Sequence, residues 1–324
     1  MEHAANADDL VDIWERGGGM NRTGRPHEIE PTALDLWVVL RARTEIGESP
    51  VWSQRTQELY FVDIAGQAIH TYRPSDGRQR LFTLPDLVTS VSLRVGGGLL
   101  LSLRKTFAFY DPETGHLEVL ADPEPDRPRN RFNDARCDPQ GRLWAGTMSA
   151  DDWLTPTGAV YRLDPDQRIT RMIDEVSCSN GTGWSPDGRT IYHTQSFRYA
   201  IHAYDFEPET GAIANRRLFV TLPPDGGGFP DGLTVDEQGF VWSAQPVYGR
   251  IVRYDPDGGI DRIISLPVSR GTSCTFGGPD LRTLFITSAT ETLTEAQIAE
   301  EPLAGSVLAC IPGVRGIPTP LFAG

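Results

Sequence analysis

Six side chains that carry oxygen recur at one position of a repeated motif in this sequence. Each lies four residues before an apolar residue that leads into a turn. The six are Glu48, Thr89, Asn133, Asn180, Asp231 and Thr272, with gaps of 41, 44, 47, 51 and 41 residues. Carboxylate, amide and hydroxyl oxygens that converge on one point form a site for a divalent cation. The two carboxylates would nearly neutralise the charge of a bound dication. Because the protein would supply only a few ligands, coordination positions would stay open for water and substrate.

The repeated motif also predicts the elements that bring these residues together. It reads as a short strand, a turn with Asp, Pro or Gly, and a second strand, in residues 132–144, 179–192, 230–242 and 271–284, with weaker copies at 48–60 and 89–101. A period of about 40 to 50 residues with several strand-like runs is typical of a propeller blade. Six copies predict an all-β, six-bladed β-propeller. Because inner strands run along the propeller axis, residues just before them would ring one mouth of the channel.

The ends of the chain stand outside this repeat. Residues 1–32 are predicted to be a disordered tail, a lid or a contact segment, and residues 33–324 the propeller. A strand over residues 36–43 precedes the first copy, so we expect it to complete the last blade and close the ring. Within the repeat region, a helical pattern occurs only at residues 293–301, and the last strands are expected at residues 307–311 and 320–322.

Composition and charge exclude several classes of protein. The net charge is −14 and no block of Lys and Arg occurs, which argues against binding to nucleic acid or to an anionic membrane. No apolar run approaches the ~20 residues of a membrane helix, and the N-terminus lacks an apolar secretory segment. We therefore expect a cytoplasmic protein, as a monomer or a small homo-oligomer. The four cysteines show no metal-ligand spacing and are predicted to be buried thiols.

Each ring residue also has a purely structural interpretation. Asn and Asp are common in turns, Glu48 could be a surface carboxylate, and the two threonines fit lining positions better than metal coordination. Arg131 lies two residues before Asn133 and could hold an oxygen-rich substrate through its fork of donors or form a surface salt bridge. The shared register favours one common site over six separate explanations.

At these residues the sequence resembles the senescence-marker-protein (regucalcin)/gluconolactonase family. The resemblance covers about residues 35–315, and its motifs lie at residues 46–52, 133–148, 180–188, 230–236 and 276–280. It implies a six-bladed propeller with one divalent metal ion, such as Ca²⁺, Zn²⁺, Mn²⁺ or Mg²⁺. It also implies hydrolysis of a sugar lactone.

The resemblance further implies roles for individual residues. The family's metal ligands fall on Glu48, Asn180 and Asp231, and its substrate-contacting residues on Arg131 and Asn133. From these we expect metal-assisted hydrolysis of a sugar lactone to the sugar acid, with Asp231 as the base. The alternatives are another ester or organophosphate hydrolase on the same scaffold, and a non-catalytic calcium- or ligand-binding propeller.

Three stretches depart from the family pattern. Gln195 stands where the family often has Asp, and the segment from Ser243 to Gly249 differs from the usual pattern of apolar residues followed by glycine. Trp153 belongs to a stretch where family members place a loop over the substrate. These departures leave the predicted metal ligands intact and bear on the identity of the substrate. His193 alternates with its neighbours in a strand and is expected to be a core or outer-layer histidine.

Overall fold

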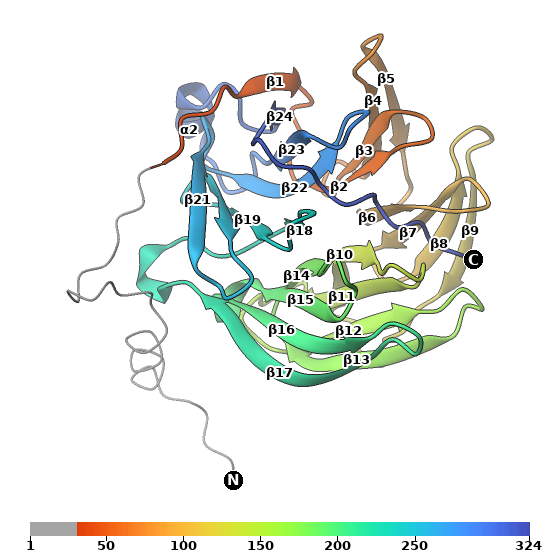
Figure 1. The fold of residues 1–324 in the computed structure, drawn as a ribbon. Helices are drawn as coiled ribbons and strands as arrows, with labels where there is room; N and C mark the ends of the chain where they lie inside the picture. The colour runs from red at the N-terminus through yellow and green to blue at the C-terminus, as the bar shows by residue number, and fades with distance from the viewer. Residues whose placement is uncertain (1–30) are drawn as a thin grey trace.

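The computed structural model describes residues 31–324, which form six four-stranded antiparallel sheets arranged as a β-propeller (Figure 1). This confirms the predicted fold class. The first three blades consist of β2 (Gly47–Ser53), β3 (Glu58–Asp63), β4 (Ala68–Arg73) and β5 (Arg78–Thr83); β6 (Val88–Leu93), β7 (Leu99–Leu103), β8 (Phe107–Asp111) and β9 (His116–Ala121); and β10 (Asn130–Cys137), β11 (Leu143–Ser149), β12 (Gly158–Leu163) and β13 (Ile169–Val176).

The remaining three blades follow the same order from the inner to the outer strand. They consist of β14 (Ser179–Trp184), β15 (Thr190–Gln195), β16 (Ala200–Glu207) and β17 (Ala212–Thr221); β18 (Leu233–Val235), β19 (Val241–Gln245), β20 (Arg250–Tyr254) and β21 (Ile260–Ser265); and β22 (Gly271–Gly277), β23 (Thr283–Ser288), β24 (Val307–Cys310) and β1 (Trp37–Leu40). The short helices of the described chain are η1 (Ser196–Arg198), η2 (Pro224–Gly226) and α2 (Glu295–Glu300).

The first strand closes the ring, as predicted. β1 pairs with β24 as the outermost strand of the last blade, and Trp37 lies opposite Ala309 (Figure 1). The strand spans residues 37–40 and is shorter than the predicted 36–43. One sheet thus joins the beginning and the end of the described chain.

The predicted tail falls almost entirely outside the described residues. Its last residue, Thr32, donates its backbone N–H to Ile263 O at 2.8 Å, and Leu34 and Leu36 pack against the core between the fifth and sixth blades. The boundary between residues 32 and 33 stays a prediction. Residues immediately after it are already held by the propeller.

The end of the chain crosses the propeller at the end where the inner strands finish. After β24 it passes the turns of the fifth and sixth blades, and Phe322 forms a parallel bridge with Arg94 at the end of β6 (Figure 1). The Phe322 ring is fully buried against the core between the second and third blades. The predicted strand at residues 320–322 is therefore a single bridge.

The expectation of buried thiols is confirmed, because all four cysteines are free and buried. Among residues 31–324 no helix is long and apolar enough to cross a bilayer. The cytoplasmic location and the oligomeric state stay predictions.

A buried aspartate locks the turn after the inner strand in two blades. The Asp236 carboxylate accepts hydrogen bonds from the backbone N–H groups of Gln238 and Phe240, from Trp242 Nε1 at 2.9 Å, and from Arg253 Nε and Nη2 at 2.9 and 2.7 Å. In the third blade, Asp138 accepts the equivalent bonds from two backbone N–H groups of its turn and from Trp144 Nε1, and its arginine partner is Arg142, within the turn itself. The repeated Asp-x-x-Gly-x-x-Trp pattern therefore encodes a turn and its anchor to the blade.

Removing the Asp236 carboxylate should destabilise the fold strongly. The Asp236→Ala variant leaves the guanidinium of Arg253, which is 3% exposed, without its buried partner. Breaking such a pair costs about 3–5 kcal/mol of the free energy of unfolding. Denaturant unfolding measures the loss, and Asp280→Ala, an exposed aspartate in the turn between β22 and β23, is the control. Similar unfolding midpoints for the two variants would contradict the anchoring role.

Candidate active site

Five of the six ring residues lie at bulges of the inner strands, and this corrects the prediction that they precede the strands. The register shifts at the same level in five blades, between Glu48 and Val51, Val88 and Ser90, Phe132 and Ala135, Ser179 and Thr182, and Gly271 and Ser273. Only Asp231 precedes its strand, β18, and its N–H bonds to Ala244 O at 2.9 Å. A bulge inserts an extra residue and redirects side chains locally. The repeated motif therefore contains the bulge as well as the turn.

A glycine brings two of the predicted ligands together. A Cβ atom on Gly181 would lie 2.3 Å from Leu233 N and 2.7 Å from Asp231 O. Both neighbours are backbone atoms, which cannot give way as a flexible side chain could. Only glycine allows this approach of β14 to the start of β18, and it sets Asn180 beside Asp231.

Three predicted ligands carry oxygens that the protein leaves unsatisfied or barely satisfied. Asn180 donates its amide to Ser196 Oγ at 3.0 Å, and its Oδ1 has no donor among the described residues. Oδ1 of Asp231 likewise has no donor there. Glu48 Oε2 accepts only the backbone N–H of Ser49, at 2.8 Å. Buried acceptors without partners are costly, so these oxygens are arranged for something other than packing.

The buried carboxylates at this site disfavour one another's ionised form. Burial, followed by the nearby Asp134 carboxylate, raises the pKa of Glu48 to about 8. Burial and the charge of Glu48 raise the pKa of Asp231 well above its usual value, and burial also raises the pKa of Asp134. A cation among these groups would relieve both the repulsion and the missing hydrogen bonds.

The donor set therefore fits a hard divalent cation held by Glu48, Asn180 and Asp231. No three His, Cys, Asp or Glu side chains within residues 31–324 come together as a preformed metal site. The predicted set contains only two residues of these types, because its third member is an amide. The metal site stays a prediction that the unsatisfied oxygens support.

The two threonines of the ring have structural partners. Thr89 Oγ1 donates to Ser102 O at 3.2 Å within the second blade. Thr272 Oγ1 bonds to Gly47 O, which links the sixth blade to the first, and lies 3.0 Å from Thr287 Oγ1. Their oxygens are occupied in holding strands together, which agrees with the expectation that they line the ring.

Arg131 and Asn133 form one hydrogen-bonded unit beside the predicted ligands. Arg131 Nη1 donates to Asn133 Oδ1 at 2.8 Å, and Asn133 Nδ2 donates to Ser179 O at 2.9 Å. The alternative of a surface salt bridge for Arg131 finds no support, because the described residues offer it no ion-pair partner within 4.0 Å. Its Nε and Nη2 make no hydrogen bond there either. Burial lowers the pKa of Arg131, and its free donors suit a neutral, oxygen-rich molecule.

Comparison with known proteins identifies the family. Residues 46–290 match the model of the SMP-30/Gluconolactonase/LRE-like region. The chain belongs to this family. Regucalcin of Xenopus laevis is 36% identical over 301 residues, which cover 90% of this chain and 100% of that protein. The 6-deoxy-6-sulfogluconolactonase of Pseudomonas putida is 38% identical over 292 residues, covering 89% and 99%.

A solved structure agrees with the fold of this family member. The crystal structure of a calcium-binding protein, regucalcin, from Agrobacterium tumefaciens matches with a TM-score of 0.85 at 27% identity. The match covers 89% of this chain and 97% of that one. The family resemblance noted in the sequence motifs is thereby confirmed.

The candidate site of this SMP-30/gluconolactonase family member includes groups that the sequence pattern missed. Asp134 is 6% exposed, accepts the N–H of Ala135 at 2.8 Å, and has an Oδ2 with no donor among the described residues. Cys178 Sγ lies 3.8 Å from the amide nitrogens of both Asn133 and Asn180. The sequence could have indicated Asp134, because it directly follows the ring residue Asn133 inside the bulge. No sequence feature pointed to Cys178.

The departures from the family pattern lie near the same end of the propeller. Trp153, in the loop between β11 and β12, stacks on Phe197 at 5.8 Å between ring centroids, and Phe197 packs against Phe229 at 5.2 Å. Gln195 ends β15 and is buried. In the segment from Ser243 to Gly249, Gln245 Nε2 donates to Tyr254 OH at 2.7 Å. The stretch in which family members place a loop over the substrate is thus held against Phe197 through Trp153. His193 is buried in β15, as expected.

Proposed function

We propose that this protein hydrolyses a sugar lactone to the corresponding sugar acid with the help of one divalent cation. The observation that carries the proposal is the group of buried side chains Glu48, Asn180 and Asp231 beside the donors of Arg131. Asn180 Oδ1 and Asp231 Oδ1 have no donor among the described residues. The sulfogluconolactonase relative at 38% identity supports the choice of substrate class.

The residues of the site have different roles in the opening of a cyclic ester. When bound, a divalent cation supplies a Lewis acid that polarises a carbonyl group and lowers the pKa of water. Arg131 and Asn133 orient the sugar hydroxyls. Asp231 accepts a proton from the attacking water, whose oxygen adds to the carbonyl carbon. The ring C–O bond then breaks, and the proton goes to the departing alkoxide to give the hydroxy acid.

A second candidate function is binding of calcium without catalysis. It is favoured by the regucalcin relatives, one of which is described as a calcium-binding protein. The same three ligands would serve this role, but Arg131 and Asn133 would then have no substrate to hold. Hydrolysis of another ester or of an organophosphate on the same site is a third possibility.

Activity on a panel of aldonolactones separates these candidates. A pH-indicator assay reports acid release before and after removal of metal with a chelator, and after metal is added back. We expect hydrolysis that is lost with the chelator and restored by a divalent cation. Tight metal binding without hydrolysis of any lactone would favour the binding function, and hydrolysis of only other esters would change the substrate class.

Arg131→Ala should weaken substrate binding and leave the metal in place. Its guanidinium contacts no predicted metal ligand directly and has donors to spare. Loss of hydrogen bonds from a charged donor should raise KM by about 10- to 100-fold, with a smaller effect on kcat. Steady-state kinetics with metal analysis measure both effects, and Arg129→Ala, with a side chain that is 83% exposed, is the control. An unchanged KM would remove Arg131 from the substrate site.

A further inference from the structure

A cavity lined by arginines lies at the opposite end of the propeller from the candidate active site. It has a volume of about 430 Å³ and sits between the first and second blades. β2 enters the candidate site with Glu48 and reaches the cavity with Trp52 and Ser53. Ser53 lies five residues after Glu48 along the strand, which corresponds to roughly 16 Å. The cavity is therefore a separate place on the molecule.

The cavity gathers an excess of positive charge in an acidic protein. Three carboxylates line it, those of Glu58, Asp111 and Glu113, against the guanidinium groups of Arg55, Arg73, Arg78, Arg80 and Arg94. The whole chain carries a net charge of −14. Thr319 and Leu321, from the segment that crosses this end of the propeller, complete the wall. Five cations from two blades and their turns thus surround a space large enough for a small molecule.

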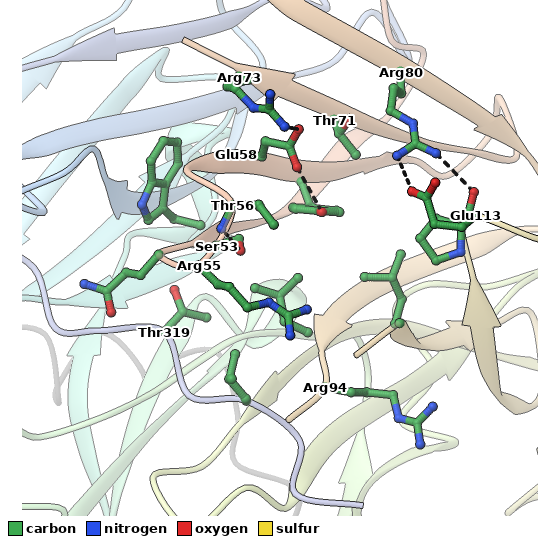
Figure 2. Close-up of a pocket in the computed structure, with 18 of the residues that line it drawn as sticks. Ser53, Arg55, Thr56, Glu58, Thr71, Arg73, Arg80, Arg94, Glu113 and Thr319 are labelled. Carbon is green, nitrogen blue, oxygen red and sulfur yellow. Dashed lines mark hydrogen bonds and ion pairs between the residues drawn. The ribbon is translucent and has the colours of Figure 1, made fainter. Parts of the chain in front are cut away.

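Three of the five arginines have no ion-pair partner among the described residues. Arg73 pairs with Glu58 at 2.8 Å and Arg80 with Glu113 at 2.6 Å (Figure 2). Arg55, Arg78 and Arg94 form no ion pair with any described residue. Figure 2 shows Arg55 extending its guanidinium into the middle of the lining side chains, with no interaction to the other residues drawn. The Arg80 pair is itself weak, because Glu113 is 73% exposed.

The structure also holds two of the guanidinium groups in fixed orientations. Arg80 stacks over the ring of Phe82 at 4.6 Å, and Arg94 over the ring of Phe109 at 3.6 Å. Arg94 Nε donates to Gly324 O at 3.0 Å. Stacked guanidinium groups lose little freedom when they bind a ligand and present planar donor forks that match phosphate oxygens.

We propose that this cavity is a binding site for a small phosphorylated molecule. A phosphate group would lie between Arg55 and Arg78, which have no ion-pair partner among the described residues, and the stacked Arg80 would add a third set of donors. The rest of the ligand would rest against the apolar part of the wall formed by Phe82 and Leu99. The proposal does not depend on the lactonase function, because the cavity contains none of the candidate catalytic residues.

Isothermal titration calorimetry on the full chain tests this site. The probes are glucose 6-phosphate, adenosine diphosphate and inorganic phosphate, with glucose as the uncharged control. We expect one saturable site for at least one phosphate probe, no binding of glucose, and weaker binding as salt is added. The Arg55→Gln, Arg78→Gln double variant should raise Kd by about tenfold or more. Its lactonase activity should be unchanged.

A matched control separates this site from general electrostatic attraction. Arg282→Gln removes an exposed arginine from the turn between β22 and β23, at the same end of the propeller but outside the cavity, and should bind like the wild type. Which probe binds tells a sugar phosphate from a nucleotide. Absence of saturable phosphate binding, or equal Kd values for the double variant and the wild type, would overturn the proposal.

Discussion

Asp231→Asn should reduce the rate of lactone hydrolysis by about 10²–10⁴-fold, the usual contribution of a general base. The amide keeps an oxygen at the same place but has no proton-accepting carboxylate and one negative charge less. Asp231 is 6% exposed, and its Oδ1 has no donor among the described residues. The substitution therefore leaves the packing almost unchanged, and we expect the stability of the fold to be retained.

The kinetics of Asp231→Asn are best measured at saturating metal, so that weaker metal binding and loss of the base are separated. Asp280→Asn is the matched control, because this aspartate is exposed in a turn away from the site. If Asp231→Asn with metal bound hydrolyses lactones like the wild type, another group is the base, and Asp134 is the next candidate.

Glu48→Gln should abolish tight metal binding and at the same time stabilise the metal-free protein at alkaline pH. Glu48 is buried, repelled by Asp134, and has a pKa raised to about 8 from the usual 4.5. A carboxyl whose pKa is higher in the folded state binds more protons there than in the unfolded state. The metal-free fold therefore loses stability as pH rises from about 4.5 to about 8. At about 1.4 kcal/mol per pKa unit, the loss amounts to a few kcal/mol.

Unfolding of metal-free wild type and Glu48→Gln at pH 5 and pH 8 checks this prediction. The wild type should be less stable at pH 8, and the neutral amide should remove most of that difference. Added divalent cation should stabilise the wild type at pH 8 and leave the variant unaffected. A variant that is less stable than the metal-free wild type at pH 8 would show that the charged Glu48 supports the fold.

The sequence predicted the propeller because each blade repeats the same local signals. In the fifth blade, Asp236 bonds to its turn and to Trp242 within a single hairpin. In the third blade, Asp138 bonds to its turn and to a tryptophan in the same way. Contacts between residues this close in the sequence can be predicted from a single sequence. The strand that closes the ring was predictable because it stands before the first repeat.

The shared position in the repeat also identified the candidate site, but it did not show which oxygens lack a hydrogen-bond donor. Thr272 and Asn180 occupy the same position of the repeat, yet the Thr272 hydroxyl binds the next blade and the Asn180 oxygen has no donor among the described residues. That difference depends on partners far apart in the sequence. The same holds for the cavity around Arg55, whose arginines come from two blades and lie against the end of the chain. The bulges were missed because they shift the register by a single residue.

The most direct test of the central claim is the metal content of protein purified without chelator, for the wild type, Glu48→Gln and Asp231→Asn. Elemental analysis should find about one divalent cation per wild-type chain and clearly less in both variants, since each lacks one of the two carboxylates that balance the ion's charge. Equal metal content in all three proteins would contradict a site built from Glu48, Asn180 and Asp231.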